Sequence, residues 1–248
     1  MELKILGSSS KGNCYLLDNG KDCLMIECGI AFKEVQKAVN FDISRIAGVI
    51  VSHEHGDHAK YANKCLDARI PLFMSQGTKD ALKLSECVLV HAMNELKVYQ
   101  IGAFRVQPFN AQHDAREPFG FLIYHPECGK VLFATDTFYL RYTFQGLNNI
   151  LIECNYDQEI LDANVEAGKL PMALRMRTMK SHCSFTTCRE TLLANDLSKV
   201  NHIVLIHLSD GNSNEKMFQR TIQEETGKTV HVAQSGMTIK ISMYHHFN

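Results

Sequence analysis

One short stretch of this sequence concentrates side chains that bind metal ions. Three histidines, a glutamate and an aspartate occupy the positions from His53 to His58. They directly follow the apolar run 46–51, which is typical of a buried strand. The cluster is therefore expected where a strand ends.

The spacing within the stretch predicts two groups of ligands. His53 and His55 are two residues apart in an extended segment, so they project from the same side of the chain. Gly56 is expected to turn the backbone sharply, so that Asp57 and His58 face a second point. Imidazole nitrogen and carboxylate oxygen together are the ligands of zinc, manganese or iron(II). Two neighbouring divalent ions are the expected occupants.

Other histidines and acids stand at the ends of further predicted strands. Strand ends that meet at one edge of a sheet can build a single site. The side chains with this placement are Glu27, His113, Asp136, Glu153 and His207. For Glu27 two interpretations are open: it meets solvent, or it orients a metal-bound histidine. His91, His125, His202, His231, His245 and His246 have no such setting and are interpreted as structural.

The elements that position these residues are short strands with helices between them. Strands are predicted at 2–7, 14–18, 23–28, 46–51, 71–75, 88–90, 98–101, 104–114, 119–124, 130–135, 149–153, 202–208, 229–233 and 236–242. Helices are predicted at 31–40, 59–68, 78–84, 157–167, 185–194 and 213–226. Asn19-Gly20 predicts a hairpin between the second and third strands. Because no internal linker is recognisable, we expect one domain, residues 1–248, in two β-rich halves covered by helices.

The composition narrows the class of protein. A chain of 248 residues with 45% hydrophobic residues can fill a sizeable core. No stretch approaches the roughly 20 apolar residues of a membrane span, so no membrane partner and a cytoplasmic location are expected. Nine scattered cysteines without a C-x-x-C pair indicate reduced thiols. The net charge of −1 argues weakly against a protein that wraps long nucleic acid.

Two further segments are candidates for phosphate binding. The polar stretch 7–13 is predicted to be a loop whose backbone and side chains, Ser9, Lys11 and Asn13, approach an anion, although such loops are more often simple turns. The run 169–180 contains Arg175 and Arg177 and no acid. It is either a solvated surface or a patch that faces phosphate or a second subunit.

With these motifs in place, the sequence resembles the metallo-β-lactamase fold superfamily. The resemblance rests on His53-x-His55-x-Asp57-His58 followed in order by His113, Asp136 and His207. It implies an α/β fold, an αββα sandwich of two mixed sheets with helices on the outer faces. By position it implies one ion held by His53, His55 and His113, a second held by Asp57, His58 and His207, and Asp136 bridging both. A bridging aspartate is typical of phosphodiester and thioester hydrolases of this fold and argues against antibiotic hydrolysis.

Within the superfamily the sequence is most similar to the WalJ/YycJ-like group, with features shared by tRNase Z and by phage anti-Pycsar phosphodiesterases. The matching stretches include Leu151-Ile152-Glu153-Cys154-Asn155 and Ser181-His182-Cys183-Ser184. In the tRNase Z pattern a glutamate and a histidine at these positions act near the scissile phosphate, which implies such a role for Glu153 and His182. Glu27 departs from the aspartate that is usual there. The clamp that tRNase Z uses for tRNA is not recognisable, which argues against tRNA processing.

The resemblance implies a phosphodiesterase that uses two divalent ions, zinc or manganese, to hydrolyse a nucleotide substrate through a metal-bridging hydroxide. Asp57 would orient the nucleophile, and His182, supported by Glu153, would protonate the leaving group. A nuclease or exonuclease of the WalJ/YycJ type is the main hypothesis. A cyclic nucleotide phosphodiesterase of the anti-Pycsar type is the alternative, and a thioester or lactone hydrolase is a further one. A homodimer is expected from relatives of the fold.

Overall fold

The computed structural model describes residues 1–84 and 87–244, in which the strands form two seven-stranded sheets. In hydrogen-bonded order, the first sheet contains β14 (Thr238–Lys240), β1 (Glu2–Ser9), β2 (Gly12–Asp18), β3 (Cys23–Ile26), β4 (Ile46–Ile50), β5 (Leu72–Ser75) and β6 (Val90–Met93). The second sheet contains β13 (Thr229–Val232), β12 (His202–Ile206), β11 (Asn149–Glu153), β10 (Gly129–Ala134), β9 (Phe119–His125), β8 (Phe104–Asn110) and β7 (Tyr99–Ile101). His245 and His246 lie outside the described residues.

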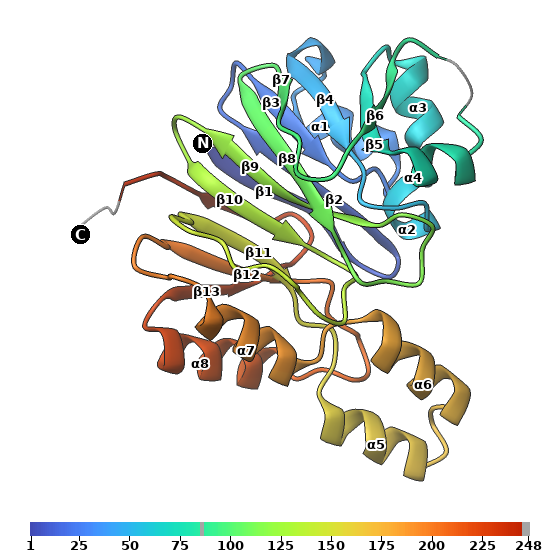
Figure 1. Ribbon diagram of the computed structural model, residues 1–248, viewed down its shortest axis with the longest axis vertical. Helices are drawn as coiled ribbons and strands as arrows, with labels where there is room; N and C mark the ends of the chain where they lie inside the picture. The colour runs from blue at the N-terminus through green and yellow to red at the C-terminus, as the bar shows by residue number, and fades with distance from the viewer. Residues whose placement is uncertain (85–86, 245–248) are drawn as a thin grey trace.

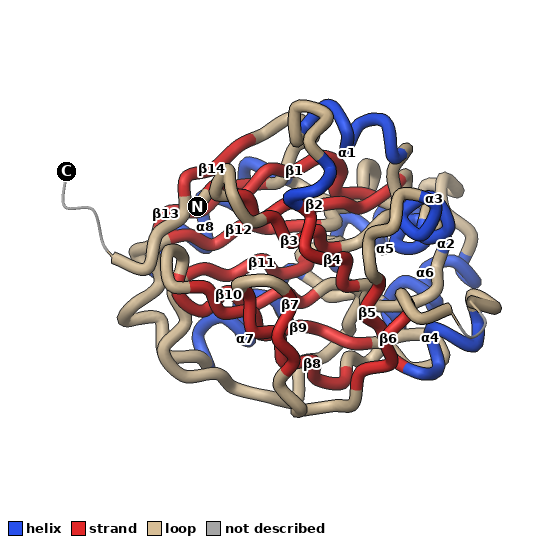
Figure 2. Tube along the Cα trace, turned by 90° about the horizontal axis from the view of Figure 1, so that it is seen from above, coloured by secondary structure: helices blue, strands red, loops and turns tan. Residues whose placement is uncertain are grey.

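Both sheets are mixed. β3, β4, β5 and β6 are parallel to one another, whereas β14, β1 and β2 are antiparallel to their neighbours. In the second sheet β10 to β13 are parallel, and β7, β8 and β9 are antiparallel. The strands of both sheets fill the centre of the molecule in Figure 2.

Helices cover the outer face of each sheet. The first sheet packs against α1 (Phe32–Ala38), α2 (Gly56–Ala59), α3 (Ala62–Asp67) and α4 (Gln76–Ala81), with a short 3-10 helix at Ile43–Arg45. The second sheet packs against α7 (Phe185–Ala194) and α8 (Glu215–Thr226). α5 (Gln158–Glu166) and α6 (Met172–Ser181) pack on each other at the side of the molecule (Figure 1). The predicted αββα sandwich is therefore confirmed.

Side-chain alternation along the strands explains why both faces of each sheet are covered. In β12, Ile203 and Leu205 pack against α7 and α8, whereas Val204 and Ile206 lie in the core between the sheets. All four are fully buried. A strand that is apolar on both faces must be covered on both, and each such side chain contributes about 1.5–3 kcal/mol when buried.

The structure differs from the sequence-based expectation in the stretch 7–13. Ser8 pairs with Asn13 and Ser9 with Gly12, so the strands β1 and β2 continue almost to the turn and the predicted loop was wrong. Added Cβ atoms at Gly7 and Gly12 would lie 2.5 and 2.7 Å from backbone oxygens of neighbouring segments. These glycines therefore allow a close approach of backbones rather than a loose loop.

The single helix predicted at 59–68 is also wrong. Two short helices, α2 and α3, replace it, and the first begins earlier, at Gly56. The break has a tertiary cause, because the Tyr61 amide donates to the Cys28 carbonyl (3.0 Å) instead of continuing the helix. The backbone of Gly56 is not in the left-handed region. The expected sharp turn therefore does not depend on a conformation that only glycine adopts.

Among the described residues, no helix has the length and apolar character needed to cross a membrane.

Candidate metal centre

The predicted ligands meet at one edge of the two sheets. β8 runs in the same direction as β10, β11 and β12, because β8 and β10 are both antiparallel to β9. The carboxyl ends of these strands therefore lie together, and β4 of the first sheet ends opposite them. At or just after these ends stand His53 and His55 (β4), His113 (β8), Asp136 (β10), Glu153 (β11) and His207 (β12), while α2 carries Asp57 and His58.

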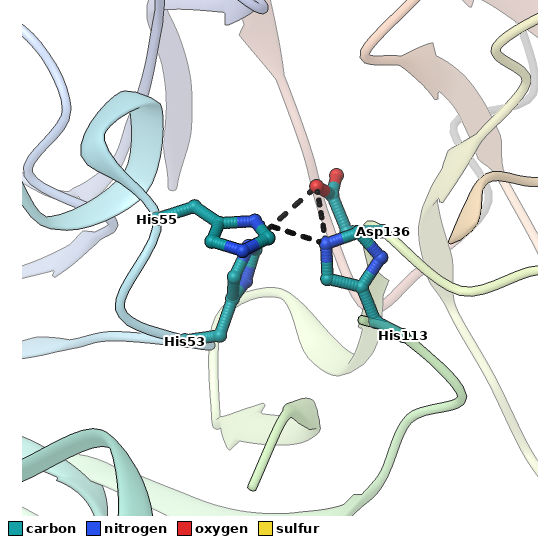
Figure 3. Close-up of side chains that lie close together, drawn as sticks. All are labelled: His53, His55, His113 and Asp136. Carbon is teal, nitrogen blue, oxygen red and sulfur yellow. Dashed lines mark hydrogen bonds and ion pairs between the residues drawn. The ribbon is translucent and has the colours of Figure 1, made fainter. Parts of the chain in front are cut away.

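The first cluster contains His53, His55, His113 and Asp136, which point toward one another in Figure 3. Oδ2 of Asp136 lies 3.3 Å from Nε2 of His113 and 3.6 Å from Nε2 of His53. Nε2 of His113 lies 3.1 Å from Nδ1 of His55. The two sheets thus supply potential ligands to a single point.

The second cluster contains Asp57, His58, Asp136 and His207. Oδ2 of Asp57 lies 3.2 Å from Nε2 of His58 and 3.2 Å from Nε2 of His207. Asp136 contacts both histidines, at 3.4 Å from His58 Nε2 and 3.3 Å from His207 Nδ1. Because Asp136 belongs to both clusters, its carboxylate occupies a bridging position.

The clusters have the dimensions of metal sites. Two ligand atoms on one tetrahedral zinc ion, each about 2.1 Å from it, lie about 3.4 Å apart. The separations of 3.1–3.6 Å in the two clusters match this value. In addition, Nε2 of His53 is buried without a hydrogen-bond partner in the described residues, as a nitrogen reserved for an ion would be. These buried His/Asp clusters fit a binuclear metal site.

Neighbouring groups fix the orientation of the histidines. Nδ1 of His113 donates to the Ser181 carbonyl (2.6 Å), which leaves Nε2 free to bind an ion. Nδ1 of His53 lies 2.8 Å from the Ser52 hydroxyl. Glu27 is fully buried, and its Oε1 lies 3.6 Å from Nδ1 of His58. This placement favours the orienting role among the two interpretations of Glu27.

Burial and charge set opposite protonation states within the site. Burial, with repulsion from His58, lowers the pKa of His53 well below its usual value, which favours the neutral form that binds metals. Burial would also lower the pKa of His207, but the carboxylates of Asp136, Asp57 and Glu153 outweigh it and raise this pKa to about 10. A divalent ion bound by Asp57 and Asp136 would displace this proton, because only the neutral imidazole of His207 binds a metal.

Glu153 and His182 form a pair beside the second cluster. Nδ1 of His182 donates to Oε1 of Glu153 at 2.7 Å, and Oε2 of Glu153 accepts from the backbone amides of Thr137 (3.0 Å) and Cys183 (3.1 Å). Burial disfavours a charged His182, but the carboxylates of Glu153 and Asp136 outweigh burial and raise its pKa. The carboxylate is fixed in place, and the imidazole lines a cavity.

That cavity, of about 330 Å³, opens over the metal centre. Asp57, His113, Asp136 and His207 form its floor, and α6 forms one wall with Leu174, Arg177 and Thr178. Asn155, Ser209 and Asn212 line it as well. A cavity with a mixed polar and apolar lining, next to a candidate site for two metal ions, suits a ligand that combines a small anionic group with an organic substituent.

Of the candidate substrate-binding residues, one lines the cavity and the others have partners elsewhere in the structure. Arg177 lines the cavity, whereas Arg175 is paired with Asp162 of α5. Lys11 is exposed and pairs with Asp210 (3.0 Å), and the Ser9 hydroxyl accepts from the Lys11 amide (3.2 Å).

Asn13 takes a different place from the one expected. Its side chain is fully buried, and its Nδ2 lies 3.3 Å from Oδ2 of Asp57 and 3.2 Å from Nε2 of His58. An amide in this position holds metal ligands and does not face a substrate.

Sequence reasoning missed two residues that hold the site together. Asn155 donates to the carbonyl of His207 (2.7 Å), and the Ser181 carbonyl accepts from His113. Asn155 follows the strand that ends in Glu153, so the same strand-end rule could have found it. Ser181 acts through its backbone, and the sequence carries no signal for that role.

Three residues of the site have a strained backbone. Asp136 and His207 have φ of 44° and 55°, and Glu27 has φ of 64°. Residues other than glycine rarely adopt such angles, but five further residues outside the site, Asn40, Phe41, Arg69, Lys83 and Leu96, do so as well, so the angle alone does not identify the site.

The αββα fold and the paired His/Asp clusters define a metal-dependent hydrolase of the metallo-β-lactamase fold. The family described as "Beta-lactamase superfamily domain" matches residues 15–208, and the chain belongs to it.

Two curated relatives share distant homology with this chain. Exodeoxyribonuclease YycJ of Bacillus anthracis is 23% identical over 240 residues, covering 90% of this chain and 88% of the relative. Exodeoxyribonuclease WalJ of Streptococcus pneumoniae serotype 2 is 23% identical over 261 residues, covering 97% and 92%. The resemblance to this group is therefore confirmed.

Two crystal structures have the same fold. The metallo-β-lactamase fold protein YhfI from Bacillus subtilis is 14% identical, with a TM-score of 0.73 over 96% of this chain and 98% of that one. Human tRNase Z, short form (ELAC1), is 17% identical, with a TM-score of 0.64 over 97% and 99%.

Proposed function

We propose that the protein is a metal-dependent phosphodiesterase that hydrolyses nucleotide phosphodiester bonds, most closely a nuclease that shortens strands from an end. His53, His55, His113 and Asp136 would hold one zinc or manganese ion, and Asp57, His58, His207 and Asp136 would hold the other. The two exodeoxyribonuclease relatives support a nucleic-acid substrate.

The observation that carries this proposal is the Glu153–His182 pair beside the metal centre. Cleavage of a phosphodiester leaves an alkoxide that needs a proton, whereas a thiolate leaving group needs little help. A histidine whose pKa is raised by Glu153 keeps a proton for that step. The pair therefore favours a phosphodiesterase over a thioester hydrolase.

Bound divalent ions would supply an activated water and stabilise charge on the phosphoryl oxygens. The chain's own residues would do the rest. Asp57, whose Oδ2 already contacts His58 and His207, is placed to accept a hydrogen bond from the attacking water and fix its direction. Arg177 would bind a phosphate oxygen from the wall of the cavity, and His182 would protonate the leaving oxygen.

A cyclic nucleotide is the second candidate substrate. The cavity of about 330 Å³ is the size of a site for one small ligand, which supports this alternative. The distant exonuclease relatives favour the polymer.

One experiment separates the candidates. Hydrolysis is measured with manganese or zinc on cyclic mononucleotides, on an end-labelled DNA duplex and its single strands, and on a thioester. Progressive shortening of the labelled strand is expected. Cleavage of cyclic nucleotides alone would establish the second candidate, and turnover of the thioester alone would refute the phosphodiesterase.

The homodimer, the cytoplasmic location and the single-domain organisation stay predictions. Light scattering of the purified protein tests the first of them.

A further inference from the structure

A second cavity, of about 220 Å³, extends along α7. One wall is the segment 139–143, and the other is a single face of α7 formed by Thr187, Glu190, Thr191 and Ala194. His182, which lines the first cavity, stands three residues before α7 begins. The two cavities therefore lie along one continuous stretch of chain.

The segment that follows Asp136 has several exposed side chains, among them Phe138, Tyr139, Arg141 and Thr143. Leu140 is buried and Tyr142 packs against the core of the second sheet, whereas Tyr139 and Arg141 are exposed. Tyr139 and Arg141 both line the second cavity. Tyr139 keeps 55% of its surface exposed, a large exposed fraction for an aromatic side chain.

The segment is held firmly although it has no regular secondary structure. The Tyr142 hydroxyl donates to Glu95, and the Tyr142 ring packs edge-on against Phe109 at 5.7 Å. The amide of Phe144 donates to Oδ1 of Asn195 of the turn after α7 (2.7 Å). The Thr137 hydroxyl also donates to the Tyr139 carbonyl (2.8 Å), so the backbone that carries Tyr139 is held in place before any ligand binds, which lowers the entropy cost of binding.

The cavity is also close to the metal centre. Tyr139 is three residues from Asp136, so their Cα atoms are at most about 11 Å apart. That distance corresponds to about three stacked nucleotides of one strand at about 3.4 Å each. A strand with one phosphate at the metal centre could therefore place a nucleotide within about three positions of that phosphate at Tyr139.

The chemistry of the two exposed groups fits such a strand. A rigid aromatic face stacks on any base, and a guanidinium binds a phosphate. Nη2 of Arg141 donates to Oε1 of Gln112 (3.1 Å), and within the described ranges no carboxylate forms an ion pair with Arg141. Glu190 lines the opposite wall, so the phosphate is expected at the Gln112 end and the base edge near Glu190.

We propose that this second cavity is a binding subsite for single-stranded nucleic acid, in which Tyr139 stacks on a base and Arg141 binds a backbone phosphate. The inference rests on the proposed nuclease function, because it assumes that a polymer crosses the metal centre.

The test compares Tyr139→Ala and Arg141→Ala with the control Phe41→Ala. Phe41 is another exposed aromatic residue, in the turn between α1 and β4, at the end of β4 opposite the metal centre. Affinity is measured by fluorescence anisotropy with a labelled phosphorothioate oligothymidylate and manganese-loaded protein. Turnover is measured on the cleavable oligothymidylate and on bis(4-nitrophenyl) phosphate, which is too small to reach the second cavity.

Loss of one stacked base is expected to raise the Kd and KM of Tyr139→Ala for the oligonucleotide about 5- to 100-fold. Arg141→Ala should also weaken binding and make it less dependent on salt. Turnover of the small diester should stay at the wild-type level in both variants, and Phe41→Ala should match the wild type throughout.

Oligonucleotide Kd and KM values equal to those of Phe41→Ala would overturn the inference, as would an equal loss of activity on the small diester. If the wild type binds the oligonucleotide through these residues but cleaves no nucleic acid, the nuclease proposal fails and the subsite stands. If the wild type cleaves DNA and both variants cleave it equally well, only the subsite is refuted.

Discussion

At the scale of single residues, Asp136 is the residue that connects the two clusters of the metal centre. Its two oxygens contact His53, His58, His113 and His207, which come from both sheets. Replacement by alanine removes a ligand from each cluster and leaves four closely spaced imidazoles without their shared carboxylate.

We expect Asp136→Ala to lose at least one ion and all turnover. Elemental analysis of the purified variant, beside the wild type prepared in the same manganese or zinc buffer, measures the bound metal. Full metal content in the variant would contradict the bridging role.

His182 is expected to behave differently, because its Nδ1 is hydrogen-bonded to Glu153, although it also belongs to a third group of potential ligands with Asp136, Glu153 and His207. We expect His182→Ala to retain both ions and to lose about 10²- to 10⁴-fold in kcat on substrates with a poor leaving group, since proton transfer by a positioned side chain contributes about that much. On nitrophenyl esters, whose leaving group needs no proton, the loss should be small. Equal losses on both substrates would rule out proton donation by this residue.

At the scale of elements, the close approach of the chain at Gly29 to α2 and β2 fixes Asp57. A Cβ atom added to Gly29 would lie 1.7 Å from the carbonyl oxygen of Asp57 and 2.9 Å from the amide nitrogen of Asn13. Both neighbours are backbone atoms, so a side chain at Gly29 must displace α2, β2 or the segment that contains Gly29.

We therefore expect Gly29→Ala to lower the free energy of unfolding by about 1–3 kcal/mol, as overpacking usually does, and to weaken binding of the ion at Asp57. Gly56→Ala is the matched control, because a Cβ atom there meets nothing within 4 Å and its backbone is compatible with alanine. The control should leave stability unchanged or raise it by up to about 1 kcal/mol. Urea unfolding and metal titration of both variants provide the comparison, and equal behaviour of the two would refute the packing argument.

Some ends of elements were predicted from the sequence. The strands ending near Glu153 and His207 and the helix at 185–194 are found as expected, because local apolar runs determine them. The break at Tyr61 was not predictable, since it depends on a hydrogen bond to Cys28, 33 positions earlier. The extension of β1 to Ser8 likewise depends on distant partners: the Ser8 hydroxyl accepts from the Tyr15 hydroxyl (2.8 Å) and from the His207 amide (2.9 Å).

At the scale of the whole molecule, the metal centre joins the two sheets. His53, His55, Asp57 and His58 belong to the first sheet and its helix, and His113, Asp136 and His207 to the second. The sequence could predict these ligands by type, but which of them share one point follows only from the packing of the sheets.

Ions bound at this junction should stabilise the folded chain as a whole. At an ion concentration 100 times the Kd, linkage predicts a gain of about 2.7 kcal/mol in the free energy of unfolding. We expect manganese or zinc to raise Tm and EDTA to reverse the change, with a smaller metal-dependent shift in Asp136→Ala. A wild-type Tm that does not respond to either ion would contradict a site shared by both sheets.

The hydrogen bond from His113 to the Ser181 carbonyl has a practical consequence for inhibition. The same helix, α6, offers Leu174 and Arg177 to the cavity and ends at the residue that holds a metal ligand. A compound that binds in the cavity against α6 and displaces the C-terminal end of this helix would break the hydrogen bond that orients His113, without contacting an ion. Such a compound would need no chelating group.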